Sequence, residues 1–231
     1  TKYQAMGQSA QQKGEPQPPL EIVPDSLGDK KDLPDPAMAE QDLKKIIDQR
    51  ISLRKYAEKP LSMEELSYLL WTTQGVKEIQ GESRTYRTVP SAGARHAFDT
   101  YLMVNNVEGL EPGLYKYIAL EHKIASVVLD AGMAEELRKA CLNQKMLTSC
   151  AVTFIWTAVM NRMTWRYQER GYRYIFLDAG HVCQNLYLAS EAIGCGTCGI
   201  AAYDDDAVNE LLGFDGYDEY VIYMGTVGKY E

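Results

Sequence analysis

A cluster of positive charge near residue 50 has the residue types of an anion site. The segment Arg50-Ile51-Ser52-Leu53-Arg54-Lys55-Tyr56 holds three cations and a hydroxyl within a chain whose formal net charge is -8. If the segment is helical, Arg50 and Arg54 share one face and Ser52 lies close enough to share a ligand. Guanidinium groups bind phosphate oxygens in pairs. The pattern therefore indicates either a phosphate site or solvated cations at a helix C-terminus.

Two further segments place arginine beside small or aromatic residues. Residues 80–96 hold three arginines around Pro90-Ser91-Ala92-Gly93-Ala94 and lack helical or strand periodicity. This composition predicts a loop on which a flat ligand rests, or a solvated surface connection. Residues 165–174 interleave aromatic residues with arginine. Because the protein is acidic, a dimer contact or the rim of a substrate pocket is favoured there over nucleic-acid binding.

The glycines and cysteines of residues 194–199 match two motifs at once. They fit the G-x-G-x-x-G dinucleotide pattern and contain the C-x-x-C pair Cys195 and Cys198. The dinucleotide motif needs a strand before it and a helix after it, whereas here a helix is expected to end at Gly194 and a strand to follow. The glycines are therefore expected to end the helix and to let backbone approach a ligand. The scattered histidines indicate no metal site, and a thiol redox role for the cysteine pair stays open.

Bulk properties limit the classes of function. With 231 residues and 45% hydrophobic content, the chain is long enough for one domain with a full core. Its acidity argues against nucleic-acid and anionic-membrane partners. The longest apolar stretch, residues 151–160, is too short to span a bilayer and predicts a buried strand. An odd number of cysteines in apolar segments indicates reduced thiols and a cytoplasmic location, and no leader-like segment opens the sequence.

The chain divides into an extended arm and one domain. Residues 1–37 hold six of the nine prolines and predict an arm that is disordered or lies over a surface, such as that of a partner subunit. The domain covers residues 38–231 and begins with a helix capped by Asp35-Pro36. Further helices are expected at 63–74, 134–142, 173–193 and 204–212, and strands at 101–107, 114–118, 124–129, from 152, 199–202 and 219–226. Without a regular βαβ alternation, this mixture predicts an α+β fold.

Three motifs together resemble a known family. They are Arg50-x-Ser52-x-Arg54-x-Tyr56, the loop from Pro90 to His96, and the stretch Asp178-Ala179-Gly180-His181 to Gln184-Asn185-Leu186. Their order and spacing resemble the FMN-dependent nitroreductase superfamily, and within it the SagB-type dehydrogenase branch. The resemblance covers residues 1–231. It implies a mixed sheet packed by helices and an intertwined homodimer that binds FMN at the subunit interface.

The resemblance also implies which residues surround the phosphate and the ribityl chain of the FMN. Arg50 and Lys229 would hold the phosphate. Ser52 would lie near the ribityl chain, with Gln144 as a further candidate on that side. A glycine-rich segment would present backbone amides to the N5 and O4 edge of the ring, at Gly199, Ile200, Ala201 and Ala202.

The remaining implied contacts are with the flavin ring. Arg54 and Lys145 would lie near its N1 and O2 edge, where positive charge stabilises the reduced ring. Pro90, Ser91 and Ala92 would come from the other subunit and cover the ring. Since the cofactor carries the chemistry, no side chain is assigned as catalytic, although Tyr167 is the first to test.

The implied activity is hydride transfer through flavin N5. The donor would be a reduced compound, with NAD(P)H as a candidate, and the acceptor a small molecule such as a nitro or quinone compound. Two departures from the family pattern limit the analogy. Ala94 and His96 replace the usual Asn and Gln, and Arg166-Tyr167 stands where azoline-oxidising members have Lys-Tyr. An arginine is a poor general base, which argues against azoline oxidation.

A second class of function stays open beside the enzyme. The chain could be a non-catalytic flavin-binding or docking subunit of a peptide-modifying complex of the SagB type. The proline-rich arm and residues 165–174 would then be its docking surfaces. Turnover of reduced cofactor by the isolated dimer would count against this alternative.

Overall fold

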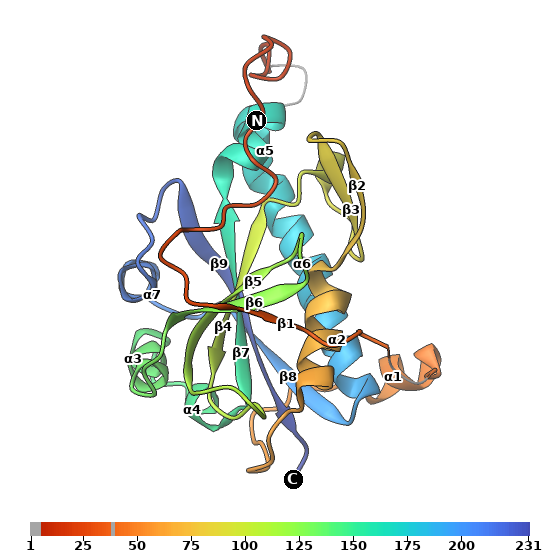
Figure 1. Cartoon of the computed structure of the whole chain (residues 1–231), viewed down its shortest axis with the longest axis vertical. Helices are drawn as coiled ribbons and strands as arrows, with labels where there is room; N and C mark the ends of the chain where they lie inside the picture. Colours follow the sequence, from red (N-terminus) through yellow and green to blue (C-terminus); the bar gives the residue numbers. More distant parts are fainter. Residues whose placement is uncertain (1–5, 38–39) are drawn as a thin grey trace.

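A seven-stranded sheet forms the centre of the molecule. The computed structural model describes residues 6–37 and 40–231. The sheet order is β1-β6-β5-β4-β7-β9-β8, and all neighbouring strands are antiparallel (Figure 1). Its strands are β1 (Lys30–Asp32), β4 (Phe98–Val104), β5 (Gly113–Ile118), β6 (Lys123–Val128), β7 (Val152–Val159), β8 (Cys195–Ile200) and β9 (Glu219–Lys229). The α+β fold expected from the sequence is confirmed, and β7 is the strand expected from residue 152.

Helices cover both faces of this sheet. They are α1 (Leu43–Gln49), α2 (Met63–Gln74), α3 (Met133–Ala140), α4 (Met146–Ser149), α5 (Met160–Tyr167), α6 (Gly171–Ala192) and α7 (Asp205–Leu212). Side chains of α2, α5 and α6 join the core on one face, and those of α3, α4 and α7 join the core on the other. No helix in the described part of the chain is long and apolar enough to cross a membrane.

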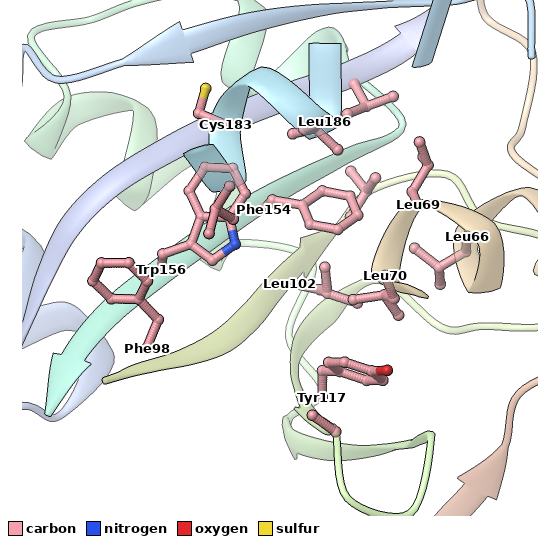
Figure 2. Close-up of a cluster of buried hydrophobic side chains, with 14 of the residues drawn as sticks. Leu66, Leu69, Leu70, Phe98, Leu102, Tyr117, Phe154, Trp156, Cys183 and Leu186 are labelled. Carbon is pink, nitrogen blue, oxygen red and sulfur yellow. The ribbon is translucent and has the colours of Figure 1, made fainter. Parts of the chain in front are cut away.

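Strand alternation divides the apolar residues between the two cores. In β7, Phe154 and Trp156 point to the side of α2 and α6, while Ile155 lies in the opposite core. Figure 2 shows Phe154 and Trp156 beside Leu102 of β4 and Leu186 of α6. All of these side chains are fully buried. A strand in the middle of the sheet is therefore buried on both faces, and β7 is buried at every position, including Thr153 and Thr157.

Local sequence determines where several helices begin and end. Ser62 and Glu65 form a capping box at the start of α2, the helix expected at residues 63–74, and α2 ends at Gly75. Gly213 ends α7 with φ +79°, a left-handed conformation that glycine adopts without strain. Gly194 follows α6 with φ +69°. These three predicted helix ends are confirmed.

The prediction that Arg50 and Arg54 share a helical face is wrong. Helix α1 begins after Asp42, which accepts hydrogen bonds from two backbone amides, and not at Asp35-Pro36. Arg50 is the residue that ends α1, and the chain then becomes extended. The amide of Leu53 donates to the carbonyl of Thr197 in β8 at 2.9 Å. Tertiary pairing with the sheet therefore overrides the local helical spacing.

The expected loop at residues 80–96 also begins with regular structure. Strands β2 (Val76–Gln80) and β3 (Arg84–Arg87) form a hairpin that follows directly on α2 (Figure 1). A short 3-10 helix, Ala92–Ala94, follows, with Gly93 at φ +59°. The hairpin was missed because its residues are mostly exposed and polar, so that they show no apolar alternation.

The described part of the proline-rich arm, residues 6–37, lies over the same chain. Its strand β1 pairs with β6 at the edge of the sheet. The Glu21 carboxylate accepts hydrogen bonds from the amides of Ala119 and Leu120, and the Pro19 carbonyl accepts one from Arg162. Figure 1 shows this segment crossing the molecule from the region of α5 to β1. Of the two alternatives for the arm, the structure places it on a surface of its own chain.

Candidate functional site

A line of three polar groups connects the extended segment, α6 and β8. The Ser52 hydroxyl lies 3.1 Å from the Tyr187 hydroxyl, and the Gly199 amide donates to the same Tyr187 oxygen at 2.7 Å. One phenol therefore fixes two of the residues expected near the FMN, one from each side. Tyr187 lies within the helix expected at residues 173–193, and no role in the site was expected for it.

Two guanidinium groups flank this line. The Arg50 guanidinium lies 5.3 Å from the centre of the Tyr187 ring, and Arg54 donates to the carbonyl of Ser52 at 3.3 Å. Burial raises the pKa of Cys198, while nearby Arg54 acts in the opposite direction, which places Arg54 beside β8. Neither arginine forms an ion pair with a carboxylate in residues 6–37 or 40–231. The arrangement leaves both cations available to an anion.

Two glycines let the extended segment lie against the sheet. A Cβ atom at Gly196 would lie 2.4 Å from Cδ2 of Leu53, and one at Gly228 would lie 2.7 Å from Cδ1 of Tyr56. The Tyr56 hydroxyl also donates to the carbonyl of Leu53 at 2.7 Å. The glycine at 196 was expected to admit a ligand, but it admits the side chain of Leu53. The glycine motif thus positions Ser52 indirectly.

Gln144 and Lys145 lie at the end of β8. The Gln144 amide donates to the carbonyl of Ala202 at 2.8 Å, which joins these residues to the segment 199–202. Ile200 is buried, whereas Ala201 and Ala202 are exposed. Lys145 is also exposed and has no carboxylate partner within the described residues. These positions extend the row of available cations from Arg50 past Arg54.

Lys229 is placed near Arg50 but is already paired. Its ammonium group forms an ion pair with the Glu65 carboxylate, in the first turn of α2. Burial and Glu191 raise the pKa of the next residue, Tyr230, while Arg50 opposes them, so Arg50 lies close to this end of β9. A phosphate held by Arg50 and Lys229 would therefore compete with Glu65 for the lysine.

Pro90, Ser91 and Ala92 lie at a different point along α6. The Ser91 hydroxyl donates to the Asp178 carboxylate at 2.6 Å, and the Ala92 amide lies 3.3 Å from both of its oxygens. Asp178 and Tyr187 are separated by about 13 Å along the helix, at 1.5 Å per residue. The structure therefore does not bring this loop onto the Ser52 line of the same chain. No role was assigned to Asp178 from the sequence, although a carboxylate within an apolar helix stretch is a signal that could have found it.

Burial and hydrogen bonding act in opposite directions on the pKa of the Asp178 carboxyl. Burial raises its pKa, and the hydrogen bonds from Ser91 and Ala92 lower it. These bonds fix the start of the 3-10 helix and leave Pro90 exposed. The loop therefore presents a small, apolar surface on a rigid support.

The cysteine pair does not have the geometry of a redox site. Cys195 lies in the core beside α6, and Cys198 lies in the core on the opposite face of the sheet. Residues three apart in a strand point to opposite faces. Burial raises the pKa of Cys195 to about 12, which keeps it a neutral thiol. All five cysteines are free and buried.

Comparison with known proteins shows the family of the chain. The nitroreductase family model matches residues 47–229. A Methanocaldococcus jannaschii protein described as a nitroreductase is 35% identical over 88% of this chain and 98% of its own length. The trifolitoxin-processing protein TfxB of Rhizobium leguminosarum is 26% identical over 72% of this chain, which spans 46% of that relative.

Solved structures show the same fold. A nitroreductase structure from Anabaena variabilis is 32% identical, with a TM-score of 0.70, over 82% of this chain and 38% of that one. A chain of the Escherichia coli microcin synthetase McbBCD complex with truncated pro-MccB17 is 18% identical, with a TM-score of 0.64, over 84% and 75%. The NADPH:FMN oxidoreductase of Vibrio harveyi with NAD+ is 17% identical, with a TM-score of 0.58, over 82% and 69%. At these lower identities the likeness concerns the fold alone. Since the family model covers most of the chain and includes the Ser52 line, the protein belongs to the nitroreductase family.

Proposed function

We propose that this protein is an FMN-dependent oxidoreductase of the SagB-type branch. In two half-reactions, a reduced donor such as NAD(P)H loses a hydride, and a small acceptor such as a nitro or quinone compound gains it. When bound, FMN supplies this chemistry by carrying the hydride on N5. The observation that carries the proposal is the Ser52–Tyr187–Gly199 line with unpaired Arg50 and Arg54 beside it.

The residues present fit a flavin phosphate and ring. Arg50 provides a guanidinium fork for phosphate oxygens, and Lys229 provides a second cation if Glu65 releases it. Ser52 offers a hydroxyl to the ribityl chain, with Gln144 farther along the same side. Arg54 and Lys145 place positive charge at the other end of the row, where a reduced, anionic ring is stabilised.

The proposal includes a homodimer. Pro90, Ser91 and Ala92 are too far along α6 to reach the Ser52 line of their own chain, so they cover the flavin bound by the partner. Helix α6 carries exposed apolar side chains at Tyr172, Phe176 and Leu177, and Phe176 is 65% exposed. An apolar helix face of this kind is typical of an interface between subunits.

A docking role in a peptide-modifying complex is the second candidate function. The names of two related proteins favour it, since one processes trifolitoxin and the other belongs to microcin synthetase. The two surfaces expected to dock a partner, the arm and residues 165–174, contact each other, because the Trp165 indole donates to the carbonyl of Glu15 at 3.0 Å. The exposed side chains of α6 would remain for a partner.

The first experiment is an anaerobic absorption titration of the purified protein with NADH and NADPH. Two visible flavin bands that bleach during the titration would support the enzyme. A colourless protein that takes up no added FMN would overturn the proposal. Bands that stay unbleached would favour the docking role or another donor.

The placement of the phosphate is tested with Arg50→Ala. This variant should elute from gel filtration without FMN while staying folded, because the guanidinium fork is lost. Lys55→Ala is the matched control, since Lys55 is an exposed cation of the same segment. Stoichiometric FMN in the Arg50 variant would refute the placement.

A further inference from the structure

Three arginines converge beside the loop that carries Pro90–Ala92. Arg166 packs on this loop, because a Cβ atom at Gly93 would lie 3.1 Å from both Cδ and Nε of Arg166 and 2.5 Å from the Tyr167 hydroxyl. Arg95 leaves the end of the loop, and its guanidinium lies 5.3 Å from the Trp165 ring centre. Arg84, in β3, is close enough to Arg95 to lower its pKa, as Arg166 is. A side chain at position 93 would push Arg166 and Tyr167 away from the loop.

The positive charge of this group is not compensated by the protein. None of the three arginines forms an ion pair with a carboxylate of the described residues. Arg95 is only 5% exposed, yet its Nε has no hydrogen-bond partner. Burial lowers the pKa of Arg95, and its like-charged neighbours Arg166 and Arg84 lower it further. The Nη2 atom of Arg95 donates to the Ser83 carbonyl at 2.7 Å, so a neutral acceptor and the Trp165 ring are the partners of this buried cation. Because neither carries a negative charge, a bound anion would stabilise this region.

A cavity opens next to Arg166. Its volume is about 360 Å³, and it is lined by Arg166, Tyr167 and five residues of the arm, namely Met6, Gly7, Ser9, Gln11 and Gln12. The arm is held in place by hydrogen bonds to residues 165–168, including one from the Gln168 side chain to the Gly7 carbonyl at 2.7 Å. Small-molecule sites start at about 300 Å³. The cavity therefore suits a molecule built on one ring, and it is too small for a whole dinucleotide.

We propose that this arm-lined cavity binds a carboxylate on the hydride acceptor and that Arg166 is the residue that recognises it. The inference rests on the proposed function, because the loop under Arg166 is the one that would cover the flavin. Arg84 and Arg95 reinforce the positive potential, and the polar arm side chains Ser9, Gln11 and Gln12 close the site. The acceptor class is accordingly a small aromatic acid that carries a reducible group.

The test compares a charged acceptor with its neutral isostere. We expect wild-type protein to prefer para-nitrobenzoate to para-nitrobenzamide in kcat/KM, and Arg166→Leu to reduce this preference about tenfold or more, the worth of a charge-assisted hydrogen bond. Arg166→Lys keeps the charge and should retain part of the preference. Equilibrium dialysis of para-nitrobenzoate with the FMN-loaded protein gives a readout apart from turnover, and the Leu variant should bind it about tenfold more weakly.

The outcomes separate this inference from the proposed function. An unchanged preference in Arg166→Leu, together with unchanged dialysis, would overturn the carboxylate site and leave the oxidoreductase proposal intact. If Arg166→Leu instead lost discrimination between NADPH and NADH and kept its preference for the charged acceptor, the arginines would bind a phosphate of the donor. That result would also overturn the carboxylate site. If the protein turns over no acceptor, the proposed function fails, and dialysis alone then decides whether Arg166 binds the carboxylate.

Discussion

Removing the Tyr187 hydroxyl tests the central line of the proposed FMN site. In Tyr187→Phe, the Gly199 amide loses its acceptor at 2.7 Å and the Ser52 hydroxyl loses its partner at 3.1 Å. Each hydrogen bond contributes about 0.5–1.5 kcal/mol, and Gly199 is partly exposed, so water replaces part of the loss. We expect a net cost to FMN binding of about 1 kcal/mol, or roughly a fivefold rise in Kd.

The assay is a titration of flavin-free protein with FMN, followed by the quenching of flavin fluorescence. Tyr203→Phe is the matched control, since Tyr203 donates to the carbonyl of Val221 at 3.2 Å and lies outside the line. Ser52→Ala completes a double-mutant cycle, in which the effects with Tyr187→Phe should be less than additive because the two hydroxyls share one bond. An FMN Kd in Tyr187→Phe equal to that of wild type, or a change of the same size in the control, would refute the reasoning.

Two further predictions concern the sheet. Burial raises the pKa of Asp99, but Arg162 and Lys116 outweigh it and lower this pKa to about 2. The Asp99 carboxylate therefore stabilises the folded protein above pH 4, and this contribution is lost as the pH falls toward 2. Asp99→Asn should lower the free energy of unfolding in urea at pH 7 by about 3 kcal/mol, and a loss below 1 kcal/mol would contradict the buried ion pair. Gly196→Ala should lower the free energy of unfolding by about 1–3 kcal/mol, because the added methyl group would overpack against Leu53. Adding Leu53→Ala should recover part of this loss. Thermal unfolding of the single and double variants checks this, and a single variant as stable as wild type would contradict the close approach.

The predictable parts of the fold are those that local chemistry determines. The capping box of Ser62 and Glu65, the helix ends at Gly75 and Gly213, and the apolar run of β7 depend on neighbours in sequence, and each was found near its predicted position. The β2–β3 hairpin was missed because its strands are exposed and lack an apolar face. Strand β1 was missed because three charged residues pair with β6 only once the arm is in place.

The candidate site shows the same division. Residue types at Arg50, Ser52 and Arg54 indicated an anion site, yet the helix inferred for them was wrong, because Leu53 pairs with β8 far away in sequence. Tyr187 and Asp178 could not be assigned from the sequence. Their partners come from other elements, and only the folded chain brings a helix phenol to Ser52 and a helix carboxylate to Ser91.

Both edges of the sheet are covered by other segments of the chain. An uncovered edge strand offers unpaired amides and carbonyls to any extended peptide. Here β1 is only three residues long, all charged, and it shields β6, while the segment at Ser52 and Leu53 pairs with the outer strand β8. The segment that carries the proposed phosphate ligands thus also blocks strand-to-strand aggregation, so that a substitution which frees it from β8 would impair solubility together with cofactor binding.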